Sequence, residues 1–178
     1  MQTETAARKT EGDDEVVALA QDAFQAARAG DVARLRERLE LGLPPNIRNE
    51  KGDSLLMLAS YHGHREAARL LLERGADPNA INDRGQTPLA GAAFRGDLAM
   101  VALLVDGSAA IEGAGPDGRT PLMFAAMFDQ ATIVAFLVGR GAVHDRRDAS
   151  GATAVALARA MGAARTAGYL EDLVRSQE

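Results

Sequence analysis

The sequence predicts an all-α protein built from stacked two-helix repeats. The first observation is a glycine that recurs every 33 residues, at Gly52, Gly85, Gly118 and Gly151. The second is that other residues fall into register with it, including a Ser/Thr column and an alanine column: Ser54, Thr87, Thr120 and Thr153, then Ala59, Ala92, Ala125 and Ala158. One such unit cannot bury its own apolar face, so the matching units predict a continuous core formed by stacking.

The order of residues within a unit predicts its elements in turn. The recurring glycine makes a tight turn at positive φ. Thr87 is placed to cap the start of a helix whose first residue is Pro88, where no backbone N–H is needed. A short alanine-rich helix follows and ends at a glycine such as Gly96. A longer amphipathic helix then carries an apolar triplet such as 70–72, and Gly75 ends it.

Three stretches, DRGQTPL, HGHREAARLLLERGADPNA and PDGRTPLMFAA, resemble ankyrin repeats. The resemblance covers about residues 16–175. It implies an ankyrin-repeat solenoid in which antiparallel helix pairs are joined by hairpin-like fingers. A disordered lead-in over 1–13 and a single repeat domain over 14–178 are expected. That domain divides into about five units of 33 residues, the first and last acting as caps: 14–48, 49–81, 82–114, 115–147 and 148–178.

The chain departs from the family pattern at several positions. The His that usually follows Thr-Pro-Leu, and bonds between neighbouring turns, is replaced in every unit, by Met57, Ala90, Met123 and Ala156. Asp129 replaces a glycine that ends a first helix, and Ser108 replaces one that ends a second helix. We expect reduced rigidity between units and caps weakened by roughly 1 kcal/mol each, with no change of fold.

Composition and charge exclude several classes of function. The chain has 178 residues, of which 47% are hydrophobic, which suits one domain. It has no cysteine, which excludes disulfides and cysteine-based zinc sites. A formal net charge of -5 disfavours nucleic acid as a partner. The chain has neither a run of about 18 apolar residues nor an N-terminal apolar signal segment, so we expect a cytoplasmic protein with no membrane partner.

No pattern of catalytic or metal-binding residues survives its sequence context. The segment GAGPDG at 113–118 matches a dinucleotide-binding motif by letter, but it lacks the required strand before it and helix after it. His62, His64 and His144 lack the spacing of metal ligands. We therefore expect no enzyme activity, no catalytic residue, no cofactor and no metal.

The resemblance also indicates where a partner would bind. In ankyrin repeats, the finger tips and the last residues of each first helix line the concave face and make most partner contacts. By register, the first-helix positions are Tyr61, His62, Phe94, Arg95, Met127, Phe128 and Met161. The finger tips add Lys51, Asp53, Arg84, Gln86, Asp117 and Arg119.

Aromatic residues are scarce in this chain, which has five Phe, two Tyr and no Trp. Three of them, Tyr61, Phe94 and Phe128, fall at the predicted contact positions, and interface hot spots favour aromatic residues, Met and Arg. We interpret Phe94 as a contact residue, with local packing between helices as the alternative. The remaining aromatic residues are predicted to lie in the core: Phe24, Phe124, Phe136 and Tyr169.

These observations favour a protein–protein interaction module that binds another protein through its concave face. A sharper form of the same hypothesis is a regulator or accessory factor of an enzyme. The alternatives are a scaffold that self-associates through the aromatic patch and a small-molecule-binding or catalytic protein. We expect a monomer rather than a homo-oligomer.

Overall fold

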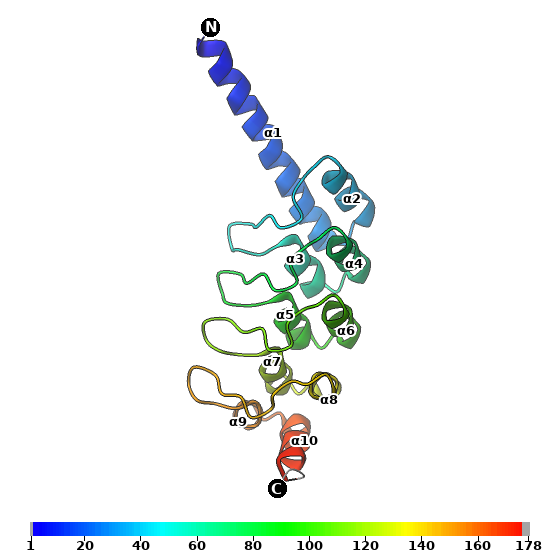
Figure 1. The fold of residues 1–178 in the computed structure, drawn as a ribbon, viewed down its shortest axis with the longest axis vertical. Coiled ribbons are helices and arrows are strands. Elements are labelled where there is room, and N and C mark those ends of the chain that lie inside the picture. The colour runs from blue at the N-terminus through cyan, green and yellow to red at the C-terminus, as the bar shows by residue number, and fades with distance from the viewer. Residues whose placement is uncertain (1, 176–178) are drawn as a thin grey trace.

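The computed structural model describes residues 2–175 as an elongated stack of helices (Figure 1). Within this range there are ten helices and no extended strand, and one isolated antiparallel bridge joins Arg48 and Ser54. The helices are α1 (Gln2–Ala29), α2 (Val32–Glu40), α3 (Leu55–Tyr61), α4 (Arg65–Glu73), α5 (Pro88–Arg95), α6 (Leu98–Asp106), α7 (Pro121–Met127), α8 (Ala131–Gly139), α9 (Ala154–Ala160) and α10 (Ala164–Arg175). The predicted all-α repeat fold is therefore confirmed.

The helices alternate between two layers, with loops projecting to one side (Figure 1). The odd-numbered helices, called first helices below, stack on one another from α1 to α9, and each packs against the even-numbered helix of its own unit. The loops at 41–54, 74–87, 107–120 and 140–153 connect one unit to the next and are called the fingers. The first helices and the fingers together form one face of the stack, which is the surface on which partner contacts are predicted.

The helix starts follow the predicted chemistry. Thr87 Oγ1 accepts a hydrogen bond from the backbone N–H of Ala90, and Pro88 occupies the first turn of α5. Thr120 caps α7 in the same way, and Ser54 and Thr153 cap α3 and α9 although no proline follows them. Each side-chain oxygen satisfies a backbone N–H that the helix itself leaves unpaired.

The core lies between the two helix layers and is continuous along the stack. Every first helix contributes one fully buried alanine at the same register position: Ala26, Ala59, Ala92, Ala125 and Ala158. Leucines and other apolar residues of both layers surround this column, among them Leu35, Leu71, Leu104 and Leu137, which are also fully buried. Small alanine side chains let neighbouring first helices approach closely. Of the aromatic residues predicted in the core, Phe24 is buried and Phe124 and Phe136 are half-buried, whereas Tyr169 is exposed.

The first unit has no finger, because α1 continues as helix where a finger would lie. The structure extends this helix back to Gln2, across the segment for which the sequence predicts a disordered lead-in. Residues 2–11 contain no proline or glycine, the two residues that most disfavour a helix. Met1 lies outside the described residues, and the division of the chain into five units remains a prediction.

Neighbouring fingers are joined by a series of hydrogen bonds, called the loop ladder below. Asn46 Oδ1 accepts from the backbone N–H of Asp77 at 2.7 Å, and Asn79 Oδ1 accepts from that of Ala110 at 2.7 Å. Glu112 Oε1 continues the series by accepting from the backbone N–H of Val143 at 3.0 Å. These acceptors stand 33 residues apart, so the same position in three successive units bonds to the following finger. Positions that the sequence analysis did not single out thus connect the units.

The glycine-rich segment 113–118 is explained by close contact between two fingers. A Cβ atom at Gly115 would overlap the backbone carbonyl group of Gly85. The corresponding residues in other units, Asn49, Asn82 and Asp148, instead fold their side chains back to accept two backbone N–H groups of their own finger. In the match to a dinucleotide motif, Gly115 therefore reflects the packing of backbone against backbone, whereas Gly118 is the recurring turn glycine at positive φ.

Asp129, which replaces a glycine at the end of α7, connects this helix to α10. Its φ of 55° lies in the left-handed region that glycine usually occupies. Its carboxylate accepts from the backbone N–H of Thr166 at 3.0 Å and from Arg165 Nε at 2.9 Å. The bond from Arg165 and then that from Thr166 hold the pKa of Asp129 below its ordinary value. The expectation that this substitution only weakens a cap was therefore incomplete, because the carboxylate gains partners in the next unit.

The loop ladder predicts the effect of removing one acceptor. Asn79→Ala leaves the backbone N–H of Ala110 without its side-chain partner. We expect the free energy of unfolding to fall by about 1 kcal/mol, measured by urea denaturation. Glu50→Ala, at an exposed finger tip, should change it by less than about 0.5 kcal/mol. Equal losses in the two variants would show that the bond contributes nothing specific.

Asp129 predicts a pH dependence of stability. Because its pKa is lower in the folded than in the unfolded chain, its carboxylate stabilises the fold above the unfolded pKa, about 4. That contribution is lost as the pH falls from about 4 through the lowered folded value. Asp129→Asn, which still tolerates positive φ, should be less stable than wild type at pH 7 and lose less stability between pH 5 and pH 2.

Urea denaturation at several pH values measures this difference. Asp83→Asn, at an exposed position on a finger, is the matched control and should follow the wild-type profile. Parallel profiles for wild type and Asp129→Asn would contradict the role given to the Asp129 carboxylate.

Candidate partner-binding surface

Three aromatic side chains form a continuous row across three units, called the aromatic ladder below. Tyr61 ends α3, Phe94 lies in the last turn of α5, and Phe128 directly follows α7. The rings of Tyr61 and Phe94 are stacked, with centroids 6.4 Å apart and planes 12° apart. The Phe94 and Phe128 rings meet edge to face, at 4.4 Å and 74°. The sequence-based grouping of these residues thus corresponds to direct contact in the structure.

The ladder follows from the packing of the first helices. The buried alanines of α3, α5 and α7 bring these helices close together, so side chains at or just after their C-terminal ends reach one another. Tyr61 and Phe94 hold equivalent positions, whereas Phe128 lies one residue beyond the position equivalent to Phe94. Gly91 lies beside the Tyr61 ring, since a Cβ atom there would be in ordinary van der Waals contact with Tyr61 Cδ2 at 3.6 Å. The position of each ring is therefore set by the core beneath it.

Exposure distinguishes the three rings. Tyr61 is 41% exposed and Phe128 is 40% exposed, whereas Phe94 is half-buried between them. Phe94 packs against both neighbouring rings, as the alternative interpretation expects, while part of its ring still faces solvent, and its role as a partner-contact residue stays a prediction. The outer two rings offer more of their surface to a partner.

The other predicted first-helix residues surround the ladder at differing depths. His62 is exposed and its ring meets the Tyr61 ring edge-on at 5.6 Å. Arg95 is exposed, with Cζ 5.6 Å from the centroid of the Tyr61 ring. Met127 is half-buried, and Met161 is 53% exposed after α9. Among residues 2–175, the contacts between aromatic rings of this row end at Phe128, so Met161 extends the row without joining the ladder.

The predicted finger-tip residues divide into exposed and inward-facing groups. Lys51, Arg84 and Asp117 are exposed. Asp53 is buried, 6% exposed, and its Oδ1 accepts from the Asn82 side-chain amide at 2.8 Å. The structure therefore places Asp53 between two fingers, where its side chain holds units together and does not form part of a polar rim.

Gln86 is held by its own finger, and Arg119 is held by its own finger and by the next one. Gln86 is half-buried, and its Oε1 accepts from the Asn82 amide at 3.4 Å. Arg119 Nε lies 3.5 Å from Asp148 Oδ2 and 3.8 Å from Asp117 Oδ2. Bonds from the Ser150 hydroxyl and the Ala152 N–H, with a smaller effect of Arg119, hold the pKa of Asp148 below its ordinary value. Binding by Arg119 would therefore compete with these ion pairs.

A groove of about 370 Å³, called the central groove below, lies beside the aromatic ladder. Apolar side chains that line it include Met57, Leu58, Tyr61 and Phe94. Three cationic side chains also line it, Arg28 from the end of α1 and Lys51 and Arg84 from two fingers. The central groove therefore combines apolar surface with positive charge.

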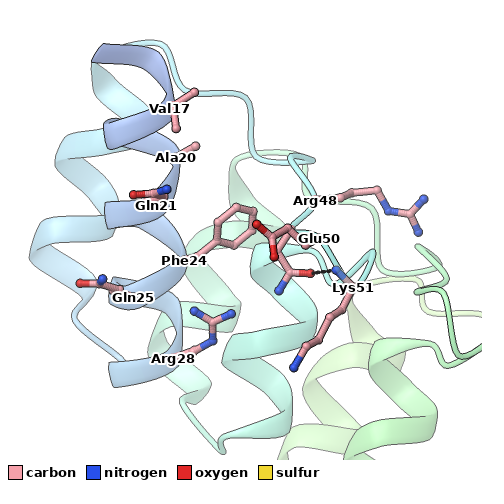
Figure 2. A pocket seen from close by; sticks show the side chains of 10 residues that line it. Val17, Ala20, Gln21, Phe24, Gln25, Arg28, Arg48, Glu50 and Lys51 are labelled. Atoms are coloured by element: carbon pink, nitrogen blue, oxygen red, sulfur yellow. Dashed lines mark hydrogen bonds between the residues drawn. The ribbon is translucent and has the colours of Figure 1, made fainter. Parts of the chain in front are cut away.

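A second groove, called the N-terminal groove below, lies between α1 and the finger at 41–54 (Figure 2). It has a volume of about 390 Å³, and Val17, Ala20 and Phe24 line it from α1. Arg28 and Lys51 line this groove as well as the central groove. The register of the repeats does not predict these contributions of α1. The available signal was the missing finger of the first unit, which leaves one side of α1 uncovered.

The histidines and acidic residues of residues 2–175 do not form a metal site, because no three metal-ligating side chains gather there. His64 Nε2 donates a hydrogen bond to the backbone carbonyl of Arg28 at 2.8 Å and so connects the first and second units. Across the same residues, each helix is too short or too polar to span a bilayer.

Comparison with known proteins agrees with the repeat architecture. A family model described as ankyrin repeats in three copies matches residues 23–113 and 92–172. A protein of Pseudomonas aeruginosa that is named as an ankyrin repeat protein is 64% identical over 47 residues. That match covers 26% of this chain and 28% of the relative, so the similarity extends over about a quarter of each protein.

The depths of the rings predict different costs of truncation. Phe94→Ala removes contacts with both Tyr61 and Phe128, so we expect the free energy of unfolding to fall by about 2 kcal/mol. Tyr61→Ala removes a more exposed ring and should cost less than about 1 kcal/mol. Chemical denaturation measures both values. If Tyr61→Ala lowered the free energy of unfolding more than Phe94→Ala, Phe94 would not be the more deeply packed of the two rings.

Proposed function

Because the chain belongs to the ankyrin repeat family, whose members generally act as protein–protein interaction modules, we propose that it binds a partner protein through its concave face. The observation that carries this proposal is the aromatic ladder, which exposes connected rings across three units. Connected aromatic surface is rare on a chain with only five Phe and two Tyr, and aromatic residues dominate the energetics of protein interfaces.

The exposed parts of the rings are large enough to matter energetically. With Tyr61 and Phe128 each about two-fifths exposed, a partner that covered them would remove roughly 80 Å² of ring surface from water at each. At about 25 cal/mol per Å², each ring would contribute about 2 kcal/mol. Two such contacts provide a substantial share of the free energy of a micromolar complex, about 8 kcal/mol.

The surface is also ordered before a partner arrives. Phe94 is held between its two neighbouring rings, and Arg95 lies over Tyr61. Side chains already restricted by such contacts lose less rotational freedom on binding. Exposed charges such as Arg84 and Arg95 would then set the orientation of the partner. A protein that binds its partner in one fixed orientation could act as a regulator or accessory factor of an enzyme, which is the finer form of this proposal.

Alanine substitution of the ladder tests the proposal. Wild type and the variant Tyr61→Ala, Phe94→Ala, Phe128→Ala serve as baits in native lysate, after circular dichroism shows that both are folded. We expect wild type to retain a partner whose affinity for the variant is at least about 100-fold lower, since three rings are lost.

The matched control replaces three exposed apolar residues outside the ladder, Ile81→Ala, Leu98→Ala and Val143→Ala. This control should retain the partner. Equal retention by all three baits would place the site elsewhere. A different result would favour self-association over partner binding. In that case no bait retains a protein, and light scattering shows a mass that rises with concentration for wild type but not for the ladder variant, Tyr61→Ala, Phe94→Ala, Phe128→Ala.

A further inference from the structure

We propose that the partner enters as an extended acidic segment with apolar side chains, lying across the N-terminal groove and the central groove. This inference rests on the proposed function, because it names the chemistry of the partner at the same concave face. It also extends the site beyond the ladder to α1, which the register of the repeats does not include among the contact positions.

The two grooves form one path. Arg28 and Lys51 line both of them, so these two cations lie at the junction between the grooves. Figure 2 shows Arg28 near the end of α1 and Lys51 on the opposite finger, with the Glu50 side chain next to the ring of Phe24. A segment that runs along α1 and on toward α5 therefore passes between Arg28 and Lys51.

Positive charge along this path contrasts with the net charge of -5 of the whole chain. The cations that line the two grooves are Arg28, Arg48, Lys51 and Arg84, against the carboxylates of Glu50 and Asp53. Asp53 is buried and its Oδ1 is occupied by the Asn82 amide. The accessible charge along the path is therefore mainly positive.

These cations also differ from most others in the molecule by having no ion pair within the described part of the chain. Elsewhere most arginines pair with carboxylates, as Arg34 does with Asp22, Arg74 with Glu40, Arg140 with Asp106 and Arg146 with Glu112. Over residues 15–175, the cations outside any ion pair are Arg28, Arg36, Arg48, Lys51, Arg84, Arg95 and Arg147. Four of these seven line the two grooves, so carboxylates of a partner would meet cations that need not break an existing pair.

Apolar surface lies on both sides of the junction. Val17, Ala20 and Phe24 provide it in the N-terminal groove. Tyr61 and Phe94 provide it in the central groove. The occupant that complements this order is a peptide with carboxylates in its middle and an apolar side chain on either side. A nucleic acid shares the negative charge but has no aliphatic side chains for these positions, so the acidic peptide is the better match.

Selection from a random 12-residue peptide library displayed on phage tests this inference. Wild type should enrich peptides of net negative charge, with apolar residues flanking Asp or Glu. The variant Arg28→Glu, Lys51→Glu, Arg84→Glu should enrich peptides of net positive charge, a change of sign that an unfolded variant would not produce. The matched control Arg36→Glu, Arg69→Glu, Arg147→Glu changes the charge equally outside both grooves and should still enrich acidic peptides.

Fluorescence anisotropy with an enriched acidic peptide gives the magnitude. We expect the reversed variant to weaken binding at least about tenfold, and a rise from 0.05 to 0.5 M NaCl to weaken wild-type binding by about tenfold. Enrichment without a charge bias, the same peptides on wild type and reversed variant, or no enrichment would overturn the inference. The inference would also be overturned if wild type bound a 20-nucleotide oligothymidylate more tightly than the peptide.

The failure of this inference differs from a failure of the proposed function. If the reversed variant retains the partner captured by wild type while the ladder variant loses it, the proposed function stands and the acidic segment is wrong. If the ladder variant retains the partner and the reversed variant loses it, the grooves bind without the ladder. These outcomes are read by adding the reversed variant, Arg28→Glu, Lys51→Glu, Arg84→Glu, as a fourth bait in the same lysate.

Discussion

The structure depends on the close approach of neighbouring first helices, which their fully buried alanines permit. One alanine per unit, from Ala26 to Ala158, brings the helices together, and leucines of both layers fill the core around them. This spacing also brings the ends of the first helices within reach of one another. The contacts among Tyr61, Phe94 and Phe128 are thus consequences of the same packing that stabilises the fold. Core and candidate site cannot be varied independently.

A second set of interactions fixes how the units are aligned. The family's bonding His is replaced in every unit, yet Asn46, Asn79 and Glu112 carry backbone bonds from one finger to the next. His64, Asp97 and Asp129 contact or bond across neighbouring units near the ends of the first helices. Polar residues therefore divide between those that hold the fingers in place and those that remain accessible. Asp53 belongs to the first group and Lys51, two residues away, to the second.

The 33-residue period and the local capping chemistry were enough to predict the repeat fold and the position of the aromatic ladder. Both depend on short-range patterns, such as Thr87-Pro88, that repeat in register. Other features depend on partners far along the chain. Asp129 resembles a weakened cap until Thr166, 37 residues later, supplies its partner. The burial of Asp53 depends likewise on Asn82 in the next finger. The N-terminal groove could not be predicted from the repeat pattern, because it exists only where the first unit has no finger to cover α1. Tyr169 was wrongly predicted in the core, because within the described chain no further unit covers the last helix.

The contact between Gly85 and Gly115 limits how far the repeats are interchangeable. Repeat proteins are often treated as strings of equivalent modules that recombination can shuffle or duplicate. Here the finger of the fourth unit accepts only a residue without Cβ at position 115 unless the backbone moves, whereas its counterparts carry Asn or Asp that close their own turns. A copy of another unit placed at this junction would bring a side chain into the neighbouring carbonyl group. The order of units is therefore part of the information that the sequence encodes, and a consensus repeat would not reproduce this junction.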